Sequence, residues 1–295
     1  MSRILRSARP DDLDRLVELN QQCYPLLPLS AEERRDLIYA RNPRCSLDNV
    51  LVLLDRAEII ASMIAYRFTQ YQENVEIPVV GIGSVAVAPD RRREGAAGEL
   101  IQLALEQYEE EELPACILYP FSHHFYRRLG WGYAGEIRQY HLLTSQLRDC
   151  EEALDDEELR VKILTLDQLP LLMRFYDAQA RRMNGLLQRG ERYWRERLLT
   201  APRIVAAAFS SGEMIGYLIY TLERCHSENI FIQEMLVHEW CAPAPEAREA
   251  LLGFIARQSD QVGSIRLFLG PDEPLHLWIE DPRLASRAMM QRLYS

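Results

Sequence analysis

The chain has 295 residues, 48% of them hydrophobic and 26% charged, with a formal net charge of -10. This composition is that of a folded protein long enough for two domains of about 150 residues, and its acidity argues against a nucleic-acid-binding protein. No apolar run approaches the roughly 20 residues that a membrane span needs, and the N-terminus has no apolar signal segment, so we expect a cytoplasmic protein with no membrane partner.

The first part of the chain predicts two helices between short strands. Ser30 and Glu33 have the spacing of a capping box, which marks the start of a helix, and the dipeptide Asn42-Pro43 stops that helix. Arg56-Ala57 separates two apolar runs and predicts a hairpin. The predicted elements are a strand at 3–8, helices at 13–23 and from Ser30 to Asn42, and strands at 50–55 and 58–68.

The stretch from Gly81 to Leu105 organises the first half of the chain. Its β-branched start predicts a buried strand at 77–87, and the segment from Arg91 to Ala97 then opens an amphipathic helix. Main-chain N–H groups at a helix start have no intrahelical partner, and the helix dipole favours an anion there. Gly95 keeps side chains away from the main chain while the arginines add charge. We therefore predict a site for a ligand that carries a pyrophosphate.

A second helix and two strands complete the first half. Four consecutive glutamates, Glu109–Glu112, end the long helix, and we expect them to be solvated because they oppose the helix dipole. Gly130 is placed to end a short helix. The predicted elements are a strand at 115–119, a helix at 125–129 and a strand at 131–144. We assign residues 1–148 to a first domain and the acidic residues 149–158 to a linker.

Residues 159–295 repeat this order loosely and predict a second domain. Where the first half has Asp90–Gly95, the second has Glu239–Ala244, which contains neither arginine nor glycine. We therefore predict that the second domain has lost the anion site and shapes a cleft or an oligomer contact. The predicted elements are strands at 159–164, 204–209, 214–222, 231–238 and 264–269, and helices at 166–184, 191–199 and 245–258.

The basic turn carries a recognisable spacing. Arg92-x-x-Gly95-x-Ala97 fits neither the mononucleotide P-loop nor the dinucleotide fingerprint. It resembles the acetyl-CoA signature, Gln/Arg-x-x-Gly-x-Gly/Ala, of the GNAT superfamily of N-acetyltransferases. The resemblance implies an α+β fold with a mixed sheet, present as tandem GNAT domains of which the second is degenerate, and acetyl-CoA as co-substrate. The alternative is an ordinary basic turn before a helix. The resemblance assigns the pyrophosphate to Arg92, Arg93, Gly95, Ala96 and Ala97.

A second run, from Leu118 to Trp131 (LYPFSHHFYRRLGW), is more diagnostic. It resembles the YP…FYR-x-(F/L)-G-(Y/W) run of the Eis (enhanced intracellular survival) acetyltransferases, which have tandem GNAT domains and a sterol-carrier-like third domain. The likeness covers essentially the whole chain, with the motifs in its first half. Enzymes of this type are thought to use their C-terminal carboxylate as the base. The sequence ends at Ser295, so we expect either a fragment or a protein with another base.

The resemblance also assigns the reacting groups. A backbone N–H of the strand Val85-Ala86-Val87 would polarise the thioester carbonyl, with Val85 the first candidate, and this strand edge would pair with the pantetheine amides. Tyr126 would protonate the leaving thiolate, and Ser122 would lie near the sulfur. From the residues alone, the favoured interpretation of Tyr126 is a structural, half-buried tyrosine on a short helix, and only the resemblance makes it the catalytic candidate.

No metal site is predicted. His123 and His124 are adjacent and cannot chelate from one face, so we interpret them as surface residues. The six cysteines have no CxxC or zinc-type spacing and are expected to be reduced thiols.

These features favour an acetyl-CoA-dependent N-acetyltransferase that acts on a primary amine of a small cationic acceptor, such as a polyamine or an aminoglycoside-like molecule. Acetylation of protein lysines or N-termini is one alternative, and a non-catalytic CoA-binding module is another. We expect a small-molecule partner, no nucleic acid and a homo-oligomer.

Overall fold

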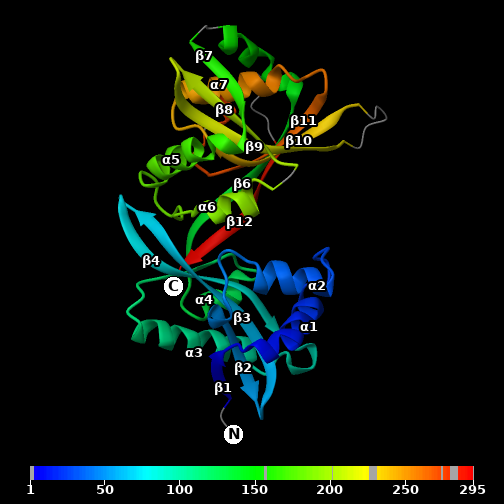
Figure 1. The fold of residues 1–295 in the computed structure, drawn as a ribbon, viewed down its shortest axis with the longest axis vertical. Coiled ribbons are helices and arrows are strands. Elements are labelled where there is room, and N and C mark those ends of the chain that lie inside the picture. The colour runs from blue at the N-terminus through cyan, green and yellow to red at the C-terminus, as the bar shows by residue number, and fades with distance from the viewer. Residues whose placement is uncertain are drawn as a thin grey trace. The chain divides into compact units, whose positions relative to one another are not determined.

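The chain forms two compact units, which the computed structural model describes over residues 3–155, 158–200, 202–225, 231–273, 275–279 and 285–294. Unit 1 comprises Met1–Ala134, Arg181–Gln188 and Arg292–Ser295, and unit 2 comprises Gly135–Ala180 and Arg189–Gln291. Each unit has its own sheet with helices packed on it (Figure 1). Within the described residues, none of the helices combines the length and apolar character that crossing a bilayer requires.

The sheet of unit 1 runs in the order β1-β2-β3-β4-β5. Its neighbouring strands are antiparallel except β4 and β5, which are parallel and joined by a helix. Its strands are β1 (Ile4–Ser7), β2 (Val50–Asp55), β3 (Glu58–Gln72), β4 (Val75–Val87) and β5 (Cys116–Leu118), and its helices are α1 (Leu13–Cys23), α2 (Ala31–Arg34, continued as a wider turn to Ala40), α3 (Ala96–Glu110) and α4 (His123–Arg127).

Helices cover both faces of this sheet, as the alternation along β2 shows. Leu51 and Leu53 lie in the core beneath α3, while Val50 and Val52 lie in a second core with α1. Successive side chains of a strand point to opposite faces, so an unbroken apolar strand requires both faces to be covered.

Two local predictions are confirmed here. Arg56 and Ala57 turn the β2–β3 hairpin with φ of 51° and 74°, the left-handed pair that suits the twist of a tight hairpin. The capping box is also present, because Ser30 Oγ accepts from the Glu33 N–H and the Glu33 carboxylate accepts from the Ser30 N–H.

Unit 2 repeats the architecture with the order β6-β11-β10-β9-β8-β7. α7 packs on one sheet face, and Phe175 of α5 contacts Tyr217 on the other, with ring centroids 6.0 Å apart. The elements are β6 (Gly132–Leu143), β7 (Leu159–Leu164), α5 (Leu169–Ala180), α6 (Glu191–Tyr193, continued to Leu198), β8 (Ile204–Ser210), β9 (Glu213–Arg224), β10 (Gln233–Cys241), α7 (Pro245–Ala256) and β11 (Val262–Leu269).

The two halves of the sequence exchange strands. Residues Arg138–Leu143 of β6 pair with β11 of unit 2, although the sequence pattern makes 131–144 the last strand of the first domain. The end of β12 (Ala285–Tyr294), which the sequence analysis did not predict, pairs instead with β5 in unit 1, with Leu293 opposite Leu118. The units therefore do not coincide with the expected ranges 1–148 and 159–295.

Residues 181–188 are a further exchanged segment. The N–H of Tyr71 in β3 donates to the Leu186 carbonyl at 2.8 Å, and the Gln188 N–H donates to the Thr69 carbonyl at 2.8 Å. This segment thus extends the sheet of unit 1 along the far end of β3. The sequence pattern placed its beginning in a helix to residue 184, but α5 ends at Ala180.

The expected linker at 149–158 overlaps a packed element. Residues Thr144–Asp155 form a 3₁₀ helix, and Leu147 is buried in the core of unit 2. Cys150 and Leu154 pack against the same core. The linker was predicted from the acidic composition of this segment, which outweighed the spacing of its few apolar residues.

Candidate active site

β4 parts from β5 halfway along its length. The parallel pairing covers Val80 to Ile82, while the pairing with β3 continues to Val87. At the point of separation the register with β3 shifts, and Ser84 takes a left-handed φ of 50°, as in a β-bulge. The second half of β4 therefore has an edge that faces away from β3 and is not paired with β5.

Val85 and Val87 direct their main-chain groups to that open edge. The Ala88 N–H donates to the Ile60 carbonyl at 2.9 Å, so residue 88 faces β3. The main-chain N–H and C=O groups of neighbouring strand residues point to alternate sides of the strand. Those of Val87 and Val85 therefore point away from β3, to the open edge. Side chains from the end of α1 confirm this direction: the Tyr24 hydroxyl donates to the Val85 carbonyl at 2.8 Å, and the Cys23 thiol donates to the Val87 carbonyl at 3.3 Å.

The predicted anion site lies directly after this edge. Arg93 and Gly95 have left-handed φ of 66° and 82°, and α3 begins at Ala96. The helix therefore starts later than the expected Arg91, because two left-handed residues interrupt the chain. Within the described chain, none of the main-chain N–H groups from Arg92 to Gly98 has a protein acceptor.

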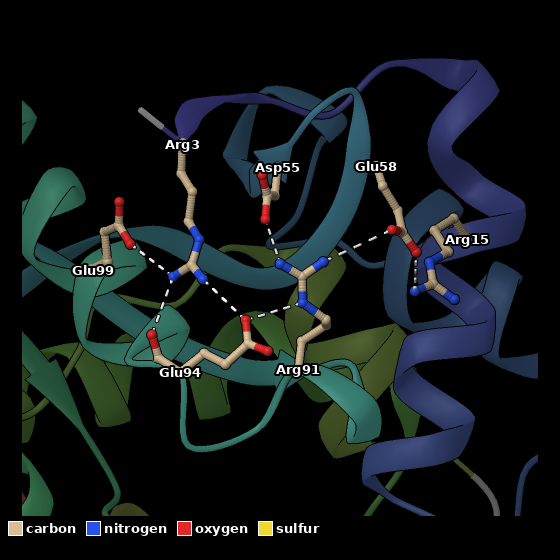
Figure 2. A network of polar contacts seen from close by, with 7 residues as sticks. All are labelled: Arg3, Arg15, Asp55, Glu58, Arg91, Glu94 and Glu99. Carbon is tan, nitrogen blue, oxygen red and sulfur yellow. Dashed lines mark hydrogen bonds and ion pairs between the residues drawn. The ribbon is translucent and has the colours of Figure 1, made fainter. Parts of the chain in front are cut away.

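The arginines of this turn have different surroundings. Arg91 is bound by carboxylates, including Asp55 and Glu94 (Figure 2), and its hydrogen bond lowers the pKa of Asp55. Arg92 is exposed and has its Nη2 3.8 Å from Cys23 Sγ. Arg93 is exposed and has no ion-pair partner among the described residues. Neither Arg92 nor Arg93 has a carboxylate partner among the described residues, so both stay candidates for binding an anionic ligand.

Tyr126 lies in an aromatic cluster on α4 and is 3% exposed. Its ring meets those of Phe125 and Trp131 edge-on, with centroids 5.0 and 5.8 Å away. Burial, and then the neighbouring phenol of Tyr24, raise the pKa of Tyr126 to about 12. Among the described residues no group accepts a hydrogen bond from its hydroxyl, so the phenol is a protonated donor without a protein acceptor.

Ser122 has a structural partner. Its Oγ accepts from the Phe125 N–H at 3.3 Å and caps α4, which fixes the start of the helix that carries Tyr126. The hydroxyl proton is still available for a ligand.

Tyr24 is a site residue that the sequence analysis missed. Its hydroxyl donates to the Val85 carbonyl, and its phenol is the second cause, after burial, of the raised pKa of Tyr126. Its own pKa is raised to about 12, mainly by burial. The only signal in the sequence was its position before Pro25, at the end of a predicted helix.

The corresponding place in unit 2 is filled by side chains. β10 also shifts register against β9, between Val237 and Glu239. There, Arg189 Nη1 lies 2.7 and 2.8 Å from the two Glu239 oxygens, and its guanidinium carbon is 3.9 Å from the Tyr176 ring centroid. The Tyr217 hydroxyl also donates to Glu239. A carboxylate thus stands where unit 1 offers main-chain groups.

In this fold, a strand separates from its parallel neighbour and leads into the start of a helix whose N–H groups are free. This combination is typical of the acyl-CoA N-acyltransferases. Comparisons with known proteins agree. Profiles of the acetyltransferase (GNAT) domain match residues 5–134 and 185–293. The chain belongs to the GNAT acetyltransferase family and carries two such domains, as the sequence analysis predicted.

The similar proteins are longer than this chain. The chain is 26% identical over 236 residues to an uncharacterised N-acetyltransferase of Streptomyces griseus, covering 71% of this chain and 56% of that protein, so it spans about half the length of its curated relative. A GCN5-related N-acetyltransferase from Anabaena variabilis shares the fold, with a TM-score of 0.83 at 20% identity over 99% of this chain and 72% of that one. Eis1 from Mycobacterium abscessus shares it with a TM-score of 0.72 at 18% identity over 99% and 73%.

Proposed function

We propose that this protein is an acetyl-CoA-dependent N-acetyltransferase whose active site lies in unit 1. One observation carries the proposal: the open edge of β4 at Val85–Val87 leads directly into a turn whose main-chain N–H groups have no acceptor among the described residues.

The residues present fit the coenzyme. A diphosphate needs several N–H donors and nearby cations, which the turn from Arg92 to Gly98 supplies. A Cβ added at Gly95 would meet no atom within 4 Å, so this side of the turn is open for a ligand. Arg92, Arg93, Gly95, Ala96 and Ala97 would hold the diphosphate. Val85, Ala86 and Val87 form the strand edge that would align the pantetheine.

The chain's own groups account for the chemistry. The Val85 N–H, fixed by the strand, would donate to the thioester carbonyl oxygen as the amine attacks, since a donor already in place needs no reorganisation. Tyr126 would donate its proton to the sulfur as the carbon–sulfur bond breaks, and its phenolate would regain the proton that the amine nitrogen loses as the new amide forms. Because its pKa is about 12, the phenol carries this proton at neutral pH.

The acceptor we propose is a small cationic amine. The acidic balance of the chain, -10 at pH 7, attracts cations by long-range electrostatics. Acetylation of a protein amine remains the second candidate for the acceptor. A non-catalytic CoA-binding module is a further alternative, and the basic turn together with Tyr126 favours the enzyme over it.

Thiol release from acetyl-CoA with spermidine, an aminoglycoside and a lysine-containing peptide tests the proposal. We expect Tyr126→Phe to lower kcat by about 100-fold or more, since general acid catalysis contributes at least that much, while CoA binding by calorimetry stays within a few-fold of wild type. Tyr108→Phe is the matched control, because Tyr108 is also buried in the core of unit 1 and its hydroxyl has no partner within the described chain.

The outcomes separate the alternatives. Unchanged turnover of Tyr126→Phe would remove the phenol from the mechanism. CoA binding without turnover of any amine would favour the binding module, and turnover of the peptide alone would favour a protein acceptor.

A further inference from the structure

Arg91 lies at the start of the turn between β4 and α3, and its guanidinium is surrounded by carboxylates. It contacts Asp55 at the end of β2, its Nε lies 3.0 Å from Glu94 Oε2, and its Nη1 lies 4.0 Å from Glu58 Oε2 (Figure 2). All three guanidinium nitrogens therefore have carboxylate neighbours, and Arg91 is 23% exposed at its side chain. It ties the turn to the β2–β3 hairpin.

Arg3 holds the same turn from the other side. Its Nη2 lies 3.1 Å from Glu94 Oε2, and its Nη1 donates to the Glu94 carbonyl oxygen at 3.3 Å and to Glu99 at 2.9 Å. Glu94 is therefore bound by Arg3 and Arg91 through one carboxylate oxygen, and its main chain is fixed as well (Figure 2). Glu99 belongs to the first turn of α3.

The charge balance of the turn depends on these contacts. Glu94 immediately precedes Gly95, so a free carboxylate here would repel a diphosphate by like-charge interaction. The Glu94 carboxylate instead has two cationic neighbours, Arg3 and Arg91, while Arg92 and Arg93 have no carboxylate partner among the described residues. The contacts also hold the backbone between two left-handed residues, Arg93 and Gly95, a conformation that needs support from its surroundings.

We propose that Arg3 and Arg91 are positioning residues for the coenzyme: they set the affinity for its diphosphate without touching it, by fixing Glu94 and the main chain of the turn. This inference rests on the proposed function. A partly buried network in which several charged groups share partners fixes side-chain and main-chain positions better than an isolated ion pair on the surface does.

The test compares acetyl-CoA with an acyl donor that lacks the diphosphate and the 3′-phosphoadenosine joined to it. Arg3→Gln and Arg91→Lys are measured with acetyl-CoA and with S-acetylpantetheine, which lacks all phosphate. Arg91→Lys keeps the charge but loses the fork that reaches several carboxylates. Arg192→Gln, which loses an exposed ion pair with Glu196 in unit 2, is the control. CoA affinity is measured by calorimetry and folding by thermal unfolding.

We expect KM for acetyl-CoA and Kd for CoA to rise about tenfold in both variants, as for the loss of a charge-assisted contact, with KM for S-acetylpantetheine, kcat and the unfolding midpoint near wild type. Equal increases in KM for both donors would show a merely structural role and overturn the inference. Unchanged CoA affinity would also overturn it while leaving the proposed function intact. Absence of CoA binding by the wild-type protein would overturn both.

Discussion

Gly95 combines two requirements that only glycine meets well. Its φ of 82° lies in the left-handed region, where a Cβ costs roughly 1 kcal/mol, and the space beside it is open. The open space indicates that the turn is kept clear for a ligand, because no protein atom lies where a side chain would go. The effect of backbone strain and the effect of blocking the ligand can therefore be measured separately with two different substitutions of Gly95.

We predict that Gly95→Glu lowers CoA affinity by at least about 100-fold, because it places bulk and negative charge where the diphosphate would sit. Gly95→Ala, the matched control, carries the backbone strain with little bulk and no charge, and should lose about tenfold or less. Calorimetry with CoA measures both. Binding by Gly95→Glu within a few-fold of wild type would contradict the placement of the diphosphate.

At the scale of single residues, the sequence motifs mark some of the candidate site residues and leave their neighbours unmarked. Arg92, Gly95 and Tyr126 stand out because a spacing or a run marks them. Tyr24 and Cys23 do not, because they reach the strand edge only once α1 packs on the sheet. The different roles of Arg91 and Arg92 were equally invisible, since Asp55 lies far away in sequence.

The loop after α1 depends on one buried cation. Arg34 is 2% exposed, and its guanidinium donates to the carbonyls of Leu29, Tyr24 and Leu27 at 2.9, 3.0 and 2.7 Å and to Asn20 Oδ1 at 2.6 Å. It thereby fixes the loop that presents the Tyr24 phenol to β4.

We predict that Arg34→Met destabilises unit 1 by about 3 kcal/mol or more, because several buried carbonyls lose their donor. Thermal unfolding followed by circular dichroism should show a midpoint lower by roughly 6–12 °C. Arg35→Met is the control: its pair with Asp14 is exposed and should contribute at most about 1 kcal/mol. Equal midpoints for the two variants would contradict this role of Arg34.

Most elements follow from local patterns, and the exceptions have a common cause. Hairpin turns, the capping box and the amphipathic helices are encoded by residues close together, so the sequence predicted them. The partner of β6, the addition of 181–188 to β3 and the existence of β12 depend on contacts between distant segments. The alternation of side chains within a strand does not determine which sheet the strand joins.

On the scale of the whole molecule, the two units differ in the groups that they offer to a diphosphate. In unit 2, Glu239 and Arg189 occupy the place of the open edge, and α7 begins with Pro245, which has no N–H to offer an anion. The residues before it include no arginine between Glu239 and Ala244.

We predict one CoA site per chain. Calorimetry should give a stoichiometry near one for the wild type, and Gly95→Glu should show no residual binding, because unit 2 lacks donors and cations for a diphosphate. A stoichiometry of two, or a second site that survives in Gly95→Glu, would contradict the assignment of the site to unit 1 alone.

The strand exchange has a consequence for biosynthesis. Unit 1 includes Arg181–Gln188 and Arg292–Ser295 as well as the first 134 residues. At translation rates of about 5–20 residues per second, the edge of β5 waits on the order of ten seconds or more after Ala134 is made before β12 emerges. During that interval the nascent N-terminal portion therefore has a β5 edge without its final partner, and an unpaired strand edge is a template for pairing with other chains.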